Sequence, residues 1–427
     1  MRIPVPNIND AGYEAGCRFA RQLIRDVFRF EPLGYNNEAR FPCNNFVYAI
    51  HVDHQPEAET VHPPVNQPGT HPIPEGTNCF TLKLSNWASE HNDRTRVENE
   101  VAAMHLARNV LAHRSPRLDP HVFGWGKGGA HQQGWILMET MKGQDLFPAF
   151  AKMNDSQKRI IVEQMADLLN CFQTYLLPDA VTQYGRLAFD QKGNVVSSSA
   201  VAPILMASSR FWEDHGPFPT YSSFLQAELR ANLTRADSNA NINGWRDNGI
   251  RIRLEAFLAY GIDSILQNFT DTRKAFYHGD FCMQNILYNP DTLQITALID
   301  FDFAVIASAA EVFMGSMNLG LGFPSPKEDK DLHKAMLHGF PDPLPPSTEE
   351  IDWTAAKMWD QAFRDRGMDR PATIPGMKDR SRLDFFMGMI NPLVFRFDFM
   401  VEDEAALVEK RTKQGNLLEK LLHEFGH

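Results

Sequence analysis

The most informative stretch of the chain is AFYHGDFCMQNILYNPDTLQITALIDFDFAV, residues 275–305, which alternates apolar runs with turns. A tight HGD turn precedes the apolar run NILY, and an NPDT turn joins this run to a second one, ITALIDF. This order predicts a β-hairpin. Because Asp280 and Asn285 flank the loop before the hairpin and Asp300 ends its returning strand, we expect all three side chains at the same end.

Each of these polar residues has a simpler structural role when it is taken alone. Asp and Asn are common in turns because their side chains hydrogen bond to nearby backbone groups. Two acids and an amide on one apolar hairpin are nevertheless costly to place beside a core unless a ligand or a reaction uses them. Phosphoryl transfer needs such a set, since it requires a carboxylate to orient and deprotonate a hydroxyl and oxygen ligands for magnesium.

The spacing of these residues resembles that of the aminoglycoside and choline kinase-like phosphotransferase family. The HGDxxxxN and IDxx elements of that family match His278, Gly279, Asp280, Asn285, Ile299 and Asp300. The TQYGRLAFDQKGNVV and GPFPTYSSFL stretches are similar to fungal members. The resemblance implies Asp280 as the catalytic base, Asn285 and Asp300 as magnesium ligands, and a supporting role for Asp302. It also implies a two-lobed, protein kinase-like α+β fold with ATP and Mg²⁺ as cofactors.

The N-terminal part of the chain is predicted to be a small antiparallel sheet with one helix. Apolar, β-branched and aromatic residues predict strands over residues 46–52 and 79–85. Between them, residues 54–76 contain six prolines, which preclude a helix or a central strand. Apolar residues spaced by three and four predict a helix over residues 95–111, with one buried face.

The remainder is predicted to be mainly helical apart from the hairpin. We divide the chain into a nucleotide-binding N-lobe, residues 1–142, and a C-lobe, residues 143–427, that carries the hairpin and substrate-binding helices. A length of 427 residues agrees with this division, because it is long for a single core. We expect the acceptor pocket near the helices that hold Trp353, Trp359, Asp360, Phe385 and Phe386. Aromatic residues at helical spacing more often form core, however, so they do not identify the acceptor.

A second polar pair is predicted in the N-lobe. Glu100 lies within the buried face of the predicted helix, where a carboxylate needs a cationic partner. Lys83 is the only basic residue of the second strand, so it is the candidate partner. The alternative for Lys83 is a solvated strand lysine. In the family that the chain resembles, such a pair holds the ATP phosphates.

The same resemblance implies two further nucleotide contacts. It places METMKGQDL at the hinge that reads adenine through the backbone, which makes Glu139 and Met141 candidate cofactor-binding residues. It places RFPCNNFVYAI at the phosphate-covering loop, where only Asn45 and Tyr48 match the family pattern. Asn covers phosphates less closely than the glycine that relatives often carry there.

Composition excludes several other classes of protein. The chain has 43% hydrophobic and 22% charged residues, with no apolar run near the eighteen or so that span a membrane. Its start does not resemble a secretory signal, and its five cysteines suit neither a disulfide framework nor a zinc cluster. The formal charge of −11 argues against nucleic acid. An acidic surface would also attract a cationic small molecule, although most acidic proteins are simply soluble. We therefore expect a cytoplasmic protein of unknown oligomeric state.

Three alternatives to a small-molecule kinase remain to be weighed. The terminal HEFGH matches HExxH, but a catalytic zinc needs a third protein ligand and Gly426 weakens the turn. A protein kinase would show DFG and an activation segment ending in APE, which IDFDFAVIASAAE lacks. A pseudoenzyme or a repurposed biosynthetic enzyme, binding a nucleotide or metabolite without phosphoryl transfer, stays open because fold does not fix function.

Overall fold

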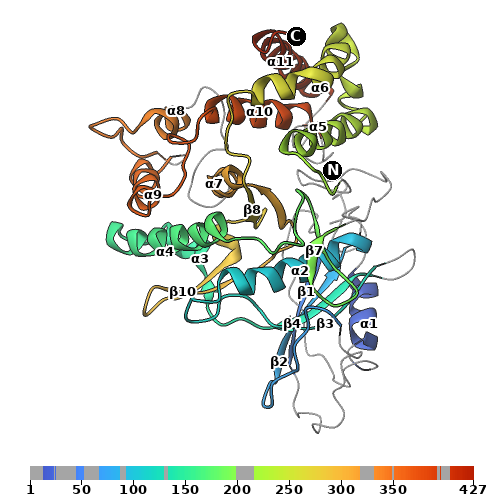
Figure 1. Cartoon of the computed structure of the whole chain (residues 1–427), viewed down its shortest axis with the longest axis vertical. Coiled ribbons are helices and arrows are strands. Elements are labelled where there is room, and N and C mark those ends of the chain that lie inside the picture. Colours follow the sequence, from blue (N-terminus) through green and yellow to red (C-terminus); the bar gives the residue numbers. More distant parts are fainter. Residues whose placement is uncertain are drawn as a thin grey trace, which may run out of the picture.

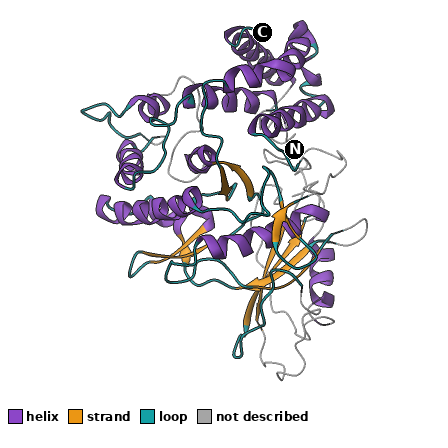
Figure 2. Cartoon of the chain, viewed as in Figure 1, coloured by secondary structure: helices purple, strands orange, loops and turns teal. Residues whose placement is uncertain are grey.

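A computed structural model provides the structure of the chain. It describes residues 13–23, 25, 45–51, 67–86, 93–128, 133–198, 216–317, 331–348, 351–391, 395 and 404–427. The first five residues of the predicted phosphate-covering loop, 40–44, and the first part of the Pro-rich segment lie outside these residues. The sheets gather in one half of the molecule and most helices in the other (Figures 1 and 2).

The N-terminal part contains a four-stranded antiparallel sheet in the order β1-β2-β4-β3. Its elements are β1 Asn45–His51, β2 Cys79–Ser85, β3 Val122–Gly126 and β4 Trp135–Glu139, with helix α2 Asp93–Val110 beside it. Alternate residues of β1 and β2 are buried on one face, as the two-residue period of a strand requires: Phe46, Tyr48, Ile50, Phe80, Leu82 and Leu84. Helix α1 Tyr13–Leu23 packs on this face through Ala20. The predicted strands and helix are confirmed, and β3 and α1 add to them.

The described half of the Pro-rich segment packs against β3. The His71 amide donates to the Val122 carbonyl at 2.8 Å, and the Trp125 ring nitrogen donates to the Pro68 carbonyl at 3.0 Å. Gln67 hydrogen bonds to both backbone groups of Trp125. Residues 67–78 contain neither helix nor strand, as the prolines predict.

The rest of the chain is mainly helical. Its helices are α3 Leu146–Phe150, α4 Asp155–Thr174, α5 Tyr221–Ser238, α6 Ile250–Leu266, α7 Ala309–Met317, α8 Asp331–His338, α9 Trp353–Asp365, α10 Met377–Ile390 and α11 Glu404–Glu424. Short strands lie between them: β5 Gln144–Asp145, β6 Leu187–Phe189, β7 Val195–Ser197, β8 Lys274–Tyr277, β9 Ile286–Asn289, β10 Gln294–Leu298 and β11 Val305–Ser308. The predicted two-lobed α+β class is confirmed.

The hairpin expected at residues 275–305 is present. Strands β9 and β10 pair in antiparallel fashion, β5 adds to β9, and β8 pairs with β11. The Leu298 amide donates to the Leu118 carbonyl at 2.8 Å, which ties the hairpin to the loop before β3. The hairpin therefore lies between the N-terminal sheet and the helical half, with α4 beside it (Figure 1).

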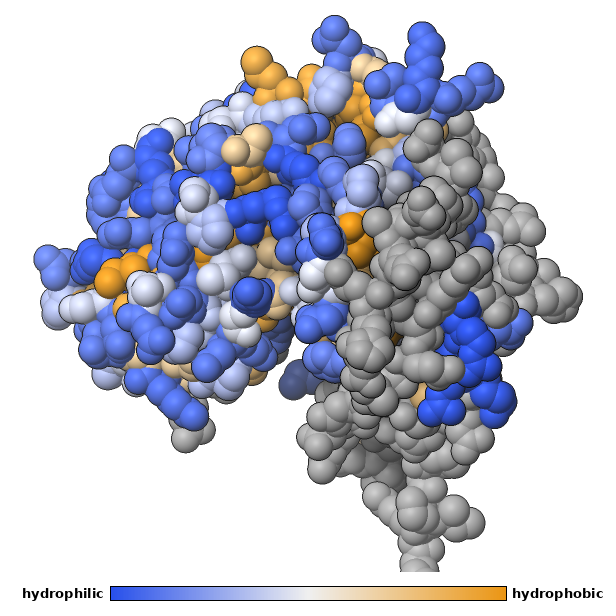
Figure 3. Space-filling model, turned by 90° about the horizontal axis from the view of Figure 1, so that it is seen from below, coloured by the Kyte–Doolittle hydropathy of each residue, from blue (hydrophilic) through white to orange (hydrophobic). Residues whose placement is uncertain are grey.

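The chain ends in the helical half, where α11 packs against α6 and α10. Helix α11 stops at Glu424 and Gly426 has a φ of +81°, so the two histidines of HEFGH do not share a helical face. Among the described helices, none is long and apolar enough to cross a membrane. The described part of the face in Figure 3 is mostly hydrophilic, with small apolar areas between polar ones.

Candidate active site

The loop after β8 depends on a glycine. Gly279 has a φ of +82°, and a Cβ atom built there would lie 2.0 Å from the Phe303 carbonyl oxygen. Only glycine fits this close approach of two backbone segments. The buried ring of His278 accepts a hydrogen bond from the Asp280 amide at 3.3 Å and packs on Phe301 at 4.6 Å. Burial lowers the pKa of His278 to about 4, so the ring is neutral and supports the loop.

Asp280 and Asn285 lie side by side. The Asn285 side-chain nitrogen donates to the Asp280 carbonyl at 2.9 Å and to its carboxylate at 2.8 Å. The Asn285 carbonyl in turn accepts from the Ile299 amide at 2.9 Å. The hairpin therefore brings the turn that carries Asp280 next to the end of β10, as the sequence predicts.

The Asp280 carboxyl is poised near neutral pH. Burial is the largest cause that raises the pKa of Asp280, and the negative charge of Asp300 is the second. Hydrogen bonds from Asn285 and the Cys282 thiol lower the pKa, and the net result is a pKa of about 6. A carboxyl with a pKa in this range suits a general base.

Asp300 follows β10 in an unusual backbone conformation. Its φ is +64°, which is rare for a residue with a side chain and marks a constrained position. Its side chain is 38% exposed, and one carboxylate oxygen lies 2.7 Å from the Lys83 ammonium. Lys83 lies equally close, at 2.7 Å, to Glu100 of α2, so the predicted Lys83 and Glu100 pair is present.

The charges around Lys83 perturb one another. Burial lowers the pKa of Lys83, but Asp300, Asp302 and Glu100 together outweigh burial and raise it well above its ordinary range. Burial raises the pKa of Glu100 to about 7 against the attraction of Lys83. The lysine is therefore a fixed cation held by several carboxylates.

Asn45 lies at the start of β1, but its side chain is engaged by protein groups. It donates to the Asp302 carboxylate at 3.0 Å and accepts from Arg96 at 2.6 Å. Arg96 and Asp302 form an ion pair at 3.4 Å. Sequence reasoning missed Arg96, although its position four residues before Glu100 places it on the same face of α2.

The predicted hinge residues lie at the end of β4 and just after it. The Glu139 amide donates to the His121 carbonyl at 2.8 Å, and its carboxylate binds Arg117 and the His121 amide. The Glu139 side chain therefore ties β4 to the segment just before β3. Met141 is partly buried and lies between β4 and β5.

The donor set of the site fits a hard divalent cation. Both hydrogen bonds from the Asn285 amide use its nitrogen, which leaves the side-chain oxygen as its ligating atom. Asp300 has a partly exposed carboxylate with one oxygen on Lys83. Oxygen ligands of this kind are those that Mg²⁺ prefers.

Several residues expected near the acceptor lie in the helical core instead. Trp353, Trp359 and Phe386 are buried, and Asp360 pairs with Arg364 and Arg370, each at 3.1 Å. The alternative that aromatic residues here form core is therefore confirmed for these three.

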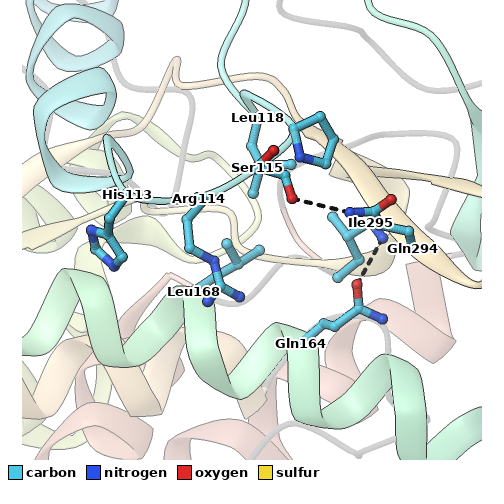
Figure 4. A pocket seen from close by; sticks show the side chains of 9 residues that line it. His113, Arg114, Ser115, Leu118, Gln164, Leu168, Gln294 and Ile295 are labelled. Carbon is cyan, nitrogen blue, oxygen red and sulfur yellow. Dashed lines mark hydrogen bonds between the residues drawn. The ribbon is translucent and has the colours of Figure 1, made fainter.

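Asp280 does not line the pocket of about 240 Å³ that Figure 4 shows. Its lining comes from the loop before β3, from α4 and from β10: His113, Arg114, Ser115, Pro116, Leu118, Gln164, Leu168, Gln294 and Ile295. Gln164 accepts from the Ile295 amide and Gln294 donates to the Ser115 carbonyl, so these polar groups already have protein partners.

Comparison with known proteins identifies the family of the chain. A model of the phosphotransferase enzyme family, APH, matches residues 80–314. The match covers more than half of the chain and includes Lys83, Glu100, Asp280, Asn285 and Asp300, so the chain belongs to this family. A comparison with curated proteins finds no significant match.

Solved structures are similar to the chain at low identity. The streptomycin-ATP complex of APH(2″)-IIa is 11% identical over 99% of both chains, with a TM-score of 0.49. The gentamicin complex of APH(2″)-IIa is 10% identical over 97% of both, with a TM-score of 0.48. The amicoumacin kinase hAmiN, solved with AMP-PNP and Ca²⁺, is 12% identical over 95% of this chain and 96% of that one, with a TM-score of 0.48.

Proposed function

We propose that the protein is an ATP- and Mg²⁺-dependent phosphotransferase that phosphorylates a hydroxyl group of a small molecule. The observation that carries this proposal is the grouping of Asp280, Asn285 and Asp300 beside the Lys83 and Glu100 pair. Phosphoryl transfer depends on positioning and charge stabilisation, and this set provides groups for both.

Each residue has a distinct task in this proposal. Asp280 accepts a hydrogen bond from the attacking hydroxyl and takes its proton, while the Asn285 amide holds the Asp280 carboxylate in place. Asn285 and Asp300 would hold Mg²⁺, which neutralises phosphate charge when it is bound. Lys83 binds phosphate oxygens, and Glu100 fixes the lysine at the position it needs.

In this proposal the two lobes have different roles. Residues 1–142 form the nucleotide-binding lobe, with the Glu139 and Met141 backbone at the adenine position, and residues 143–427 carry the catalytic hairpin and the acceptor site. The formal charge of −11 supports an acceptor that carries a positive charge. The same charge argues against nucleic acid as a partner.

A second candidate is a family member that binds nucleotide without transferring phosphate. The sequence RFPCNNFV, before and within β1, lacks the glycine that lets a loop approach phosphates closely. The complete set of Asp280, Asn285 and Asp300 favours the enzyme over this candidate.

The test is a screen of purified protein with ATP and magnesium against hydroxylated metabolites, in matched versions with and without an amine. Mass spectrometry would detect the gain of one phosphoryl group, and calorimetry would measure ATP binding separately. Transfer to an acceptor supports the enzyme. ATP binding without transfer across the panel favours the second candidate, and absence of ATP binding contradicts both.

A further inference from the structure

We infer that Asp302 is a positioning residue that closes a three-membered ring with Asn45 and Arg96 and so holds the start of β1 at the nucleotide site. This inference rests on the proposed function. The three residues come from the N-terminal sheet, from α2 and from the segment after β10, and Asn45 and Asp302 are 257 positions apart.

The ring is closed by three contacts between side chains. Asn45 donates through its nitrogen to one Asp302 oxygen at 3.0 Å, and Arg96 donates to the Asn45 oxygen at 2.6 Å. The Arg96 Nε atom lies 3.4 Å from the other Asp302 oxygen. Both ends of the Asn45 amide are therefore used, one by an anion and one by a cation.

The ring is buried and adjoins the predicted phosphate-binding lysine. Asp302 and Arg96 are each 2% exposed, and an unpaired charge at either position would be costly. The Lys83 ammonium lies 4.0 Å from the Asp302 oxygen that Asn45 contacts. Arg96 also donates to the Ser85 hydroxyl at 3.1 Å, and Ser85 pairs with Asn45 across the sheet. The ring thus fixes the ends of β1 and β2 together, two residues from Lys83.

This position gives the ring its role. The resemblance of the sequence places the phosphate-covering loop directly before and within β1, and that part of the chain lacks glycine. The side-chain contacts of Asn45 fix the start of β1. The ring joins the start of β1 to the segment that begins with Asp300, so both sides of the nucleotide site share one fixed point.

The contacts of the ring predict which substitutions of Asn45 and Asp302 preserve it. Asn45→Asp places two carboxylates in contact, and Asp302→Asn replaces the charged end of the buried Arg96 and Asp302 ion pair by a neutral amide. The double variant Asn45→Asp/Asp302→Asn moves the carboxylate across the ring but keeps one carboxylate, one amide and the guanidinium. The double variant is therefore expected to recover what each single variant loses.

The experiment measures ATP affinity in the presence of magnesium by calorimetry, which needs no acceptor. We expect each single variant to weaken ATP binding about tenfold or more, and the double variant to bind within about threefold of the wild type. Asn45→Ala is a milder variant that adds no charge and should weaken ATP binding in the same direction. Asp291→Asn, at the exposed hairpin turn, is the matched control and should bind ATP as the wild type does.

The possible results distinguish a positioning role of the ring from a purely structural one and from direct contact with the ligand. Thermal unfolding of every variant shows whether it is folded at the temperature of the titration, and Asn45→Ala replaces any single variant that is not. A folded Asn45→Ala protein with unchanged ATP affinity would mean that the ring is only structural, and would overturn the inference. Failure of the double variant to recover affinity would mean that Asp302 itself contacts the nucleotide or the metal, which also overturns it. A wild-type protein that binds no ATP would contradict the proposed function and this role with it.

Discussion

The Lys83 ammonium lies 2.7 Å from a carboxylate oxygen of Asp300, although the two residues are 217 positions apart. Lys83 belongs to β2 of the N-terminal sheet, and Asp300 follows β10 of the catalytic hairpin. The same ammonium is 2.7 Å from Glu100 on α2. One cation thus joins three elements, and its position depends on how the sheet, the helix and the hairpin pack together.

Replacement of Lys83 by Met is expected to abolish both nucleotide binding and turnover. The neutral side chain removes the cation for the phosphates and leaves Glu100 buried without its partner. We expect the free energy of unfolding to fall by about 3 kcal/mol, as when one member of a buried ion pair is removed. Denaturant titration of the wild type and Lys83→Met measures this loss.

The double variant Lys83→Met/Glu100→Gln separates stability from function. Without the unpaired carboxylate, most of the lost stability should return, while nucleotide binding should not. Equal stability of Lys83→Met and the wild type would show that the pair does not act as a buried ion pair.

Asp280→Asn is expected to abolish phosphoryl transfer while ATP still binds. The amide keeps the size of the side chain but cannot take a proton from the acceptor hydroxyl. Loss of a general base lowers turnover by about 100-fold to 10,000-fold. Steady-state kinetics with an acceptor found in the screen would measure turnover, and calorimetry would measure ATP affinity, which should change by no more than about twofold. Unchanged turnover would remove Asp280 as the base.

The parts of the site that could be predicted from sequence are those set by local geometry. Asn285 lies five positions after Asp280, so one turn brings them together, and helical periodicity alone places Glu100 on a buried face. The Asn45 side chain contacts Asp302, whose position is set by packing between distant segments. A contact between residues so far apart cannot be predicted from the pattern of neighbouring residues in the sequence.

The elements of the fold that sequence reasoning missed have short or ambiguous patterns. Strand β3, VFGWG, contains two glycines, which weaken a strand signal, and it forms because β4 and the Pro-rich segment pair with it. Helix α1 is short, and it buries Ala20 against the sheet rather than forming a core of its own. Tertiary packing decides both elements.

Gly279→Ala is expected to destabilise the protein and disorder the catalytic loop. The methyl group would overlap the Phe303 carbonyl, and a φ of +82° is unfavourable for alanine. Together these effects should lower the free energy of unfolding by about 3 kcal/mol. Gly76→Ala is a close control because its φ is +84° but no atom lies within 4 Å of the added Cβ. The control should lose only about 1 kcal/mol, and equal losses would mean that the contact with Phe303 does not matter.

Acid should weaken the attachment of the Pro-rich segment through His71. Arg108 donates to the Nε2 atom of His71, so this nitrogen must be unprotonated, and His71 also packs on His121 at 4.6 Å. Burial, followed by the charges of Arg108, His121, His105 and Arg117, lowers the pKa of His71 to about 4. In the unfolded chain the pKa is near 6.5, so between these values the unfolded state binds more protons and the folded state loses stability.

The His71→Gln variant isolates this effect, because Gln can still accept from Arg108 but does not titrate. Between pH 7 and pH 4, the wild type should lose about 1 kcal/mol more stability than the variant. This value is smaller than the pKa shift alone would give, because solvent screens the partly exposed ring. Above pH 7 the difference in stability between the two proteins should be constant. Denaturant titrations at several pH values measure both trends. If the stabilities of the wild type and His71→Gln fall in parallel down to pH 4, His71 is protonated in the folded protein. Its contact with Arg108 would then not hold the Pro-rich segment on α2 and β3.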